Sequence, residues 1–214
     1  MLHLNLSNRR IIVEATVVAA LILSGTASAD EHEACIHHQQ QASLSAGGKA
    51  TWMKSTSDYK MPDVSLVRTD GKKVSLAKEI DDGKPVILNF IYTSCTTVCP
   101  VMSQTFAGVQ DRLGTELDNV HMVSISIDPE HDTPQRLKEY EKRYNVRRQW
   151  DFYTGTIEAS IATQKAFDAY RGDKMNHLPV IFIRSAPGQP WVRMEGFASP
   201  DDIAREYRML ARQK

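Results

Sequence analysis

The sequence has little cysteine and no excess of charge of either sign. Its 214 residues include 3 cysteines, and 26 basic residues balance 26 acidic ones, so the formal net charge is zero. A chain of this size buries a core without disulfide bonds, so the few cysteines are expected to serve chemistry rather than hold the fold together. The absence of a net positive field argues against a nucleic-acid partner.

Long hydrophobic runs are also missing, apart from one segment near the start of the chain. Hydrophobic residues make up 42% of the sequence and charged residues 24%, which is the balance of an ordinary folded soluble domain. This composition argues against wholesale disorder and against a multi-pass membrane protein. The sequence contains no internal repeat and gives no sign of a second domain.

Residues 1–29 are typical of a secretory signal peptide. Arg9 and Arg10 precede a mostly apolar stretch over residues 11–23, and residues 27–29 (Ala-Ser-Ala) have the small-x-small pattern of a cleavage site. The apolar stretch is shorter than the roughly 20 residues that span a bilayer. We therefore expect an exported, periplasmic protein. If the signal were not cleaved, the protein would stay associated with the inner membrane.

Residues 30–57 are polar and rich in small side chains. They show no sustained apolar period of 2 or 3.6 residues, so we expect a flexible tail or linker ahead of one folded domain over residues 58–214. Cys35, His37 and His38 lie close together in this tail. Such donors bind copper or zinc when exposed, but an unselected polar tail with a spare thiol is the simpler interpretation.

Strand and helix patterns alternate through the expected domain. Asp70-Gly71, with apolar residues on both sides, suits the positive φ angles of a β-hairpin turn. Thr133-Pro134 and Ser199-Pro200 are typical helix starts. Further strands are predicted over residues 85–92, 119–128, 150–155 and 178–184, and helices over 98–114, 133–145, 157–170 and 199–214. This order predicts an α/β sandwich with a largely buried central sheet.

Two cysteines stand where a buried strand runs into a helix. Cys95 and Cys99 are four residues apart, and Pro100 follows them. If the first helical turn includes both thiols, they lie on one face, near enough to share a metal ion or form a disulfide. The helix N-terminus stabilises thiolate, so the more exposed cysteine should have a pKa below about 8.5. Because α/β folds place their sites at the carboxyl ends of strands, this position favours a functional pair.

Three segments together resemble one known family. FIYTSCTTVCP, SIDPEHDTPQRLKEY and the lone histidine of DKMNHLPVIFIR are similar to the Sco/SenC family of thioredoxin-like copper proteins, which assist assembly of the copper centre of cytochrome c oxidase. The resemblance extends from about Lys60 to the C-terminus. It implies a thioredoxin-like sandwich, in which helices flank a central mixed sheet and the β-hairpin is N-terminal.

The resemblance also implies a copper site. Cys95 and Cys99 match the two copper thiolates of the family, and His177 matches its distal histidine ligand. Two soft thiolates suit Cu(I), and an added imidazole gives a Cys₂His set that also holds Cu(II). Asp128 and Asp132 match a family segment beside the site, and we assign them no ligand role.

This chain departs from the family pattern around the histidine. The family usually has Asp before this histidine and Ser or Thr after it, whereas this chain has Asn176 and Leu178. Pro179 follows at the place where a thioredoxin fold has a proline facing the cysteines, often in the cis form. Met175 adds a soft thioether nearby, although a loop methionine more often serves packing.

The resemblance implies a metallochaperone or assembly factor that binds copper. Its partners would be a copper-accepting oxidase subunit and a protein that keeps its thiols reduced. The alternative is a thiol-disulfide oxidoreductase, in which Cys95 or Cys99 attacks a partner disulfide and the other cysteine resolves the intermediate. Thioredoxin-type motifs have two residues between their cysteines and this chain has three, which favours the copper role over a turnover enzyme. A Cys99 peroxidase and a redox or copper sensor are weaker alternatives.

Overall fold

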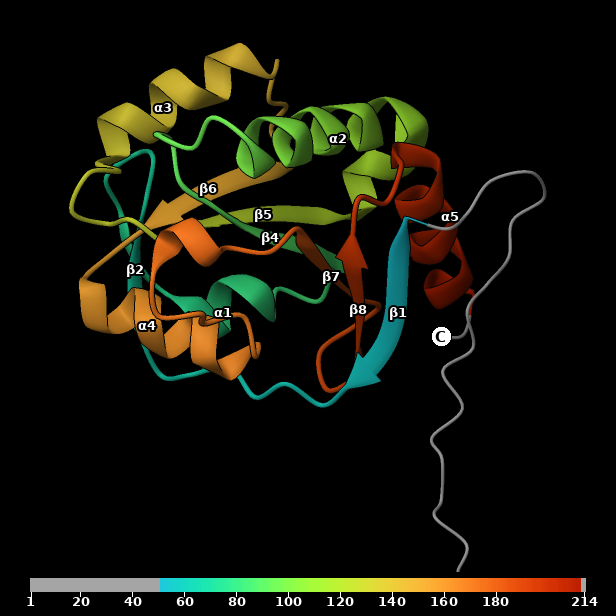
Figure 1. The fold of residues 1–214 in the computed structure, drawn as a ribbon. Coiled ribbons are helices and arrows are strands. Elements are labelled where there is room, and N and C mark those ends of the chain that lie inside the picture. The colour runs from blue at the N-terminus through green and yellow to red at the C-terminus, as the bar shows by residue number, and fades with distance from the viewer. Residues whose placement is uncertain (1–50, 213–214) are drawn as a thin grey trace, which may run out of the picture. The chain divides into compact units, whose positions relative to one another are not determined.

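One mixed sheet organises residues 51–212, the part of the chain that the computed structural model describes (Figure 1). Its strands are β1 (Trp52–Ser57), β2 (Ser65–Arg68), β3 (Lys73–Ser75), β4 (Val86–Ile91), β5 (His121–Ser126), β6 (Trp150–Thr154), β7 (Val180–Arg184) and β8 (Trp191–Gly196). The helices are α1 (Leu76–Ile80), α2 (Val98–Leu113), α3 (Pro134–Arg143), α4 (Ile157–Ala166) and α5 (Pro200–Ala211), with short 3-10 helices η1 (Gly114–Asn119) and η2 (Lys174–Asn176). The expected signal peptide and the group formed by Cys35, His37 and His38 lie outside the described residues.

The eight strands follow the order β1-β8-β7-β4-β5-β6-β2-β3. Strands β4, β5 and β6 run parallel, and β7 lies antiparallel to β4 on the other side. Every residue of β4 and of β5 is buried, as their apolar sequences predict. The predicted α/β sandwich with a central mixed sheet is therefore confirmed.

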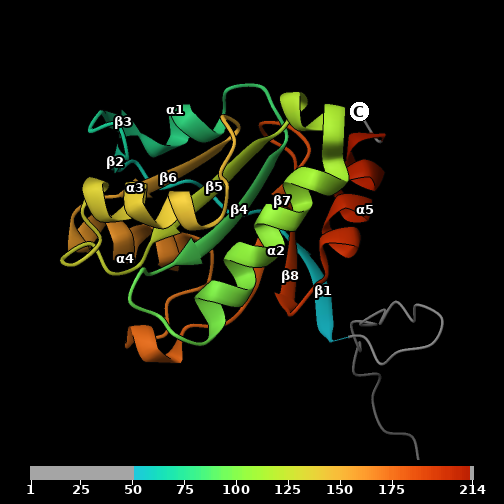
Figure 2. The ribbon, with the colours of Figure 1, turned by 90° about the horizontal axis from the view of Figure 1, so that it is seen from above.

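Helices cover both faces of the sheet and divide the core into two layers. Helices α2, α3 and α5 lie over one face, and α1 and α4 over the other (Figures 1 and 2). Both cysteines belong to the layer between α2 and the sheet. Within residues 51–212, no helix combines the length and the hydropathy that a membrane span requires.

The expected linker ends earlier than Ser57. Residues 52–57 form β1, which pairs antiparallel with β8 from Trp52 opposite Gly196 to Ser57 opposite Trp191. Strand β1 is at the edge of the sheet and most of its side chains are exposed. Such a strand is held mainly through its backbone, so its sequence lacks the apolar alternation by which a strand is recognised.

The predicted β-hairpin is present, and a second glycine fixes the backbone near the histidine segment. Strands β2 and β3 pair around Gly71, which has φ of +85°. Gly196, with φ of +112°, donates its N–H to the Pro179 carbonyl oxygen at 2.8 Å. A Cβ on Gly196 would lie 2.3 Å from the Thr51 carbonyl oxygen, so only glycine lets β1 approach this closely.

Candidate metal centre

The two cysteines lie where the carboxyl end of β4 leads into α2. Helix α2 begins at Val98, so Cys99 is in its first turn and Cys95 precedes the helix. This start agrees with the helix predicted over residues 98–114, and the first turn contains Cys99 but not Cys95. The thiols are nevertheless adjacent, because the backbone N–H of Cys99 donates to the Cys95 sulfur at 3.3 Å. The first turn of a helix has backbone N–H groups without a partner in the helix, and the side chain of the N-cap residue, Thr97, accepts from none of them. The Cys95 sulfur takes this place by accepting from the Cys99 N–H.

The surroundings of the two thiols give them very different acidities. Burial by itself raises the pKa of Cys95, but hydrogen bonds from the backbone N–H groups of Cys99 and Thr97 and from the Tyr92 side chain outweigh it and lower the pKa to about 7. Burial raises the pKa of Cys99 well above its ordinary range, although the Tyr92 N–H donates to its sulfur at 3.4 Å. Cys95 is the more exposed of the two, at 8% against 0%, so the expected acidic thiol is Cys95.

The acidity of Cys95 predicts its reactivity toward alkylating agents. In a Cys35→Ser, Cys99→Ser chain, iodoacetamide should label Cys95 at a rate that rises with pH and reaches half its maximum near pH 7. The rate rises because only the thiolate attacks, and serine at position 99 keeps the backbone N–H donor. A midpoint near the ordinary value of about 8.5, measured by mass spectrometry, would contradict this assignment.

His177 follows η2 on the segment that leads into β7. Its half-buried ring meets the Tyr92 ring edge to face, with 6.4 Å between the ring centroids. Burial lowers the pKa of His177 to about 4, against an opposing hydrogen bond with the Phe90 backbone. The imidazole is therefore neutral at pH 7, and a neutral imidazole is the form that binds metal ions.

The structure brings the two cysteines together but does not add His177 to them. No three His, Cys, Asp or Glu side chains within residues 51–212 lie close enough to hold one metal ion. Tyr92 contacts both sides, because its ring meets His177 and its backbone N–H donates to the Cys99 sulfur. A site that used all three residues would require the His177 segment to move relative to the cysteines.

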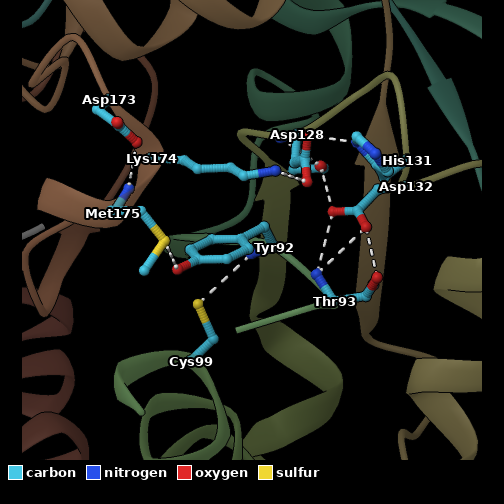
Figure 3. A network of polar contacts seen from close by, with 10 residues as sticks. Tyr92, Thr93, Cys99, Asp128, His131, Asp132, Asp173, Lys174 and Met175 are labelled. Carbon is cyan, nitrogen blue, oxygen red and sulfur yellow. Dashed lines mark hydrogen bonds and ion pairs between the residues drawn. The ribbon is translucent and has the colours of Figure 1, made fainter. Parts of the chain in front are cut away.

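A network centred on Tyr92 connects the cysteine loop to the histidine segment (Figure 3). The Tyr92 hydroxyl donates to the Met175 sulfur at 3.7 Å. Lys174 places its ammonium 5.7 Å from the centre of the Tyr92 ring and donates to Asp128 Oδ2 at 2.5 Å. No sequence pattern singles out Tyr92 or Lys174, because Tyr92 continues an apolar strand pattern and Lys174 resembles an ordinary loop lysine.

The two aspartates beside the site hold loops rather than facing the thiols. Asp132 is fully buried and accepts hydrogen bonds from the Thr93 N–H at 3.2 Å, the Thr93 hydroxyl at 2.5 Å and the Ser126 hydroxyl at 2.6 Å. Asp128 pairs with Lys174 and lies 3.0 Å from the Nδ1 atom of His131. Asp132 therefore fixes the chain two residues before Cys95, and Asp128 fastens the histidine segment.

Comparison with known proteins gives consistent matches. The family model for SCO1/SenC matches residues 53–212. The SCO1 protein homolog of Bacillus subtilis is 34% identical over 110 residues, which cover 51% of this chain and 56% of that protein. The chain thus matches little more than half the length of this relative.

Two solved structures share the fold at similar identity. BsSco is described as a member of the Sco family of cytochrome c oxidase assembly proteins with a disulfide switch. It superposes with a TM-score of 0.63 at 29% identity, covering 76% of this chain and 99% of that one. Arabidopsis thaliana ScoI, solved with copper bound, has a TM-score of 0.59 at 28% identity and covers 70% of this chain and 96% of that one. The thioredoxin-like architecture inferred from the sequence is therefore confirmed.

Proposed function

The chain belongs to the SCO1/SenC family, and on that premise we propose that it is a copper-binding assembly factor for the copper centre of cytochrome c oxidase. In this proposal Cys95 and Cys99 bind the copper and His177 is the third ligand. The observation that carries the proposal is the pair of adjacent free thiols at the start of α2. The copper bound in Arabidopsis thaliana ScoI supports it.

The donor atoms suit copper as cargo. Cys95 with its pKa of about 7 offers a thiolate near neutral pH, and Cys99 loses its proton when a soft ion replaces it. Two thiolates satisfy Cu(I) in a near-linear arrangement, and the neutral imidazole of His177 would extend the set for Cu(II). No turnover chemistry is needed for this role.

The His177 segment gives the proposed site a part that opens and closes. Met175 and Lys174 connect it to Tyr92, ahead of the cysteines, and the Lys174–Asp128 ion pair connects it to the loop after β5. A cavity of about 430 Å³ lies beside His177, between the loop after β5 and α4. We infer that copper draws His177 toward the thiols and that the segment releases again when copper is delivered.

We place the protein in the periplasm on its signal-peptide features, with a copper-accepting oxidase subunit and a thiol reductant as partners. An exported pair of cysteines becomes oxidised unless it is reduced, and a Cys95–Cys99 disulfide cannot offer two thiolates to copper. The disulfide switch described for BsSco supports a redox-controlled pair. A reductant protein is therefore part of the proposal.

A thiol-disulfide oxidoreductase is the second candidate, and the asymmetry of the thiols favours it. A partly exposed acidic thiol beside a buried one is the arrangement of an attacking and a resolving cysteine. Such an enzyme could keep the cysteines of a copper site reduced. The two roles differ in one measurable property, which is the affinity of the reduced protein for copper.

Copper titration of the full chain tests the proposal. A Cys35→Ser protein, so that Cys95 and Cys99 are the only thiols, is reduced without oxygen and titrated with Cu(I) against a competing chelator, then with Cu(II) while its absorption spectrum is recorded. We expect tight one-to-one Cu(I) binding, lost on disulfide formation. His177→Ala should weaken Cu(II) binding far more than Cu(I) binding, because two thiolates suffice for Cu(I).

The contrary outcomes are equally definite. Weak Cu(I) binding together with rapid reduction of a protein disulfide by the same chain would make it an oxidoreductase on a copper-family scaffold. Equal loss of Cu(I) and Cu(II) in His177→Ala would remove His177 from the proposed division of ligands.

A further inference from the structure

Met175 is exposed to solvent beside Tyr92, the residue whose backbone N–H donates to the Cys99 sulfur. Its exposed fraction is 72%, the largest among the exposed large hydrophobic side chains of residues 51–212. A methionine that serves packing fills gaps in a core, and this one does not. The packing interpretation favoured by the sequence is therefore wrong for Met175.

The exposed side chain is nevertheless held in place from two directions. The Asp173 carboxylate accepts a hydrogen bond from the Met175 N–H at 2.8 Å and so fixes the start of η2. At the other end, the Tyr92 hydroxyl donates to the Met175 sulfur at 3.7 Å (Figure 3). The Met175 residue is thus largely exposed while its sulfur is held by Tyr92. A ligand that takes up copper from solution requires both an exposed side chain and a fixed donor atom.

Tyr92 connects this thioether to both thiols. Its hydroxyl donates to the Met175 sulfur at 3.7 Å and its backbone N–H donates to the Cys99 sulfur at 3.4 Å, and the Cys99 N–H in turn donates to the Cys95 sulfur at 3.3 Å. The three sulfur-bearing residues become progressively more buried, from 72% exposed at Met175 to 8% at Cys95 and 0% at Cys99. These three soft donors, connected through Tyr92, thus range from solvent-exposed to fully buried.

We propose that Met175 is the entry and exit ligand for Cu(I), which binds Cu(I) first and passes it to Cys95 and Cys99 by ligand exchange. This proposal rests on the copper role proposed above. A thioether is a soft, uncharged donor that binds Cu(I) without losing a proton, and it binds more weakly than a thiolate. Transfer of Cu(I) from the thioether to the two thiolates therefore lowers the free energy. Because the thioether binds weakly, it also releases copper that returns from the thiolates.

The exchange involves no change of oxidation state. A copper–sulfur bond to Met175 breaks as bonds to the Cys95 thiolate and the Cys99 sulfur form, and the Cys99 proton leaves to solvent. The nearest cation, Lys174, is paired with Asp128 at 2.5 Å, so its charge is offset where the copper ion would arrive. Met175 is two residues from His177, so any movement of η2 moves both side chains together.

Transfer kinetics test this role, with Met209→Leu as the matched control. Met209 is also exposed, at 42%, but it lies on α5. There it lines a different cavity, together with Ser185, the residue after β7. In the reduced full chain, Met175→Leu should slow Cu(I) uptake from a chelator complex about tenfold, as judged by stopped-flow absorbance. It should slow release to an added chelator by a similar factor, because the same ligand is removed in both directions. The equilibrium Cu(I) affinity should stay at the wild-type value, and Met209→Leu should change neither rate nor affinity.

Three results would overturn the proposal. Uptake by Met175→Leu at the wild-type rate would show that copper enters elsewhere. An equal slowing in Met209→Leu would show a general effect of losing a surface thioether. A large loss of equilibrium affinity in Met175→Leu would make Met175 a resident ligand rather than an entry ligand. If the wild-type chain itself bound Cu(I) weakly, the proposed function would fail first, and the two failures are thereby distinguished.

Discussion

Cys95→Ser and Cys99→Ser should each weaken Cu(I) binding by about a hundredfold to a thousandfold at pH 7. Structural zinc sites with four ligands bind with about 10–16 kcal/mol, so one strong ligand contributes about 2.5–4 kcal/mol, or about two to three powers of ten in affinity. Serine offers a hard oxygen that does not ionise near neutral pH, so it replaces neither thiolate. Chelator competition under anaerobic conditions, in a Cys35→Ser background, measures the loss.

The pH dependence of Cu(I) binding separates the two cysteines. Copper displaces any proton on its thiols, so affinity rises with pH. Below pH 7 both thiols are protonated and about two protons leave per copper, whereas above pH 7 only Cys99 still carries one. The Cys99→Ser chain should therefore lose its pH dependence above pH 7, while Cys95→Ser keeps a dependence of about one proton throughout. Unchanged affinity in either variant would remove that cysteine from the site.

The cysteine pair could be predicted from the sequence because everything that defines it is local. The boundary between a buried strand and a helix, and the four-residue spacing of Cys95 and Cys99, fall within one short segment. The start of the predicted helix, at residue 98, agrees with α2, which begins at Val98 and so leaves Cys95 just ahead of the first turn.

His177 and its surroundings depend on contacts between segments far apart in the chain. The histidine is 78 residues after Cys99, so only the resemblance to a family pointed to it. Contacts such as Tyr92 with Met175 and Lys174 with Asp128 join residues 83 and 46 positions apart. The hydrophobic periodicity of a sequence does not report contacts between distant segments. The edge strand β1 was missed for another reason, which is that most of its side chains are exposed and show no apolar alternation.

Asp132 shows most clearly how a residue outside the ligand set controls the site. Its fully buried carboxylate accepts from the Thr93 N–H, the Thr93 hydroxyl and the Ser126 hydroxyl. Thr93 is in the loop two residues before Cys95, and Ser126 ends β5, so one side chain joins the cysteine loop to the neighbouring strand. Removing it leaves three donors without their acceptor, two on the half-buried Thr93 and one on the buried Ser126.

Asp132→Ala should therefore lower the free energy of unfolding by about 3–5 kcal/mol, since each orphaned buried donor costs about 1–3 kcal/mol. Urea unfolding of the reduced protein measures this loss, and Asp132→Asn, which keeps one carbonyl acceptor, should lose less. Asp118→Ala is the matched control, because that exposed carboxylate pairs with Arg148 at the surface and its loss should hardly move the urea midpoint of unfolding.

The reactivity of Cys95 gives a second measurement. Where Asp132→Asn remains folded, the pH midpoint of Cys95 alkylation should move upward from about 7, because the loosened loop no longer holds the Cys95 sulfur against the Cys99 N–H. If the alkylation midpoint of Asp132→Asn stays near pH 7 and Asp132→Ala unfolds no more easily than Asp118→Ala, then Asp132 does not position the cysteine loop.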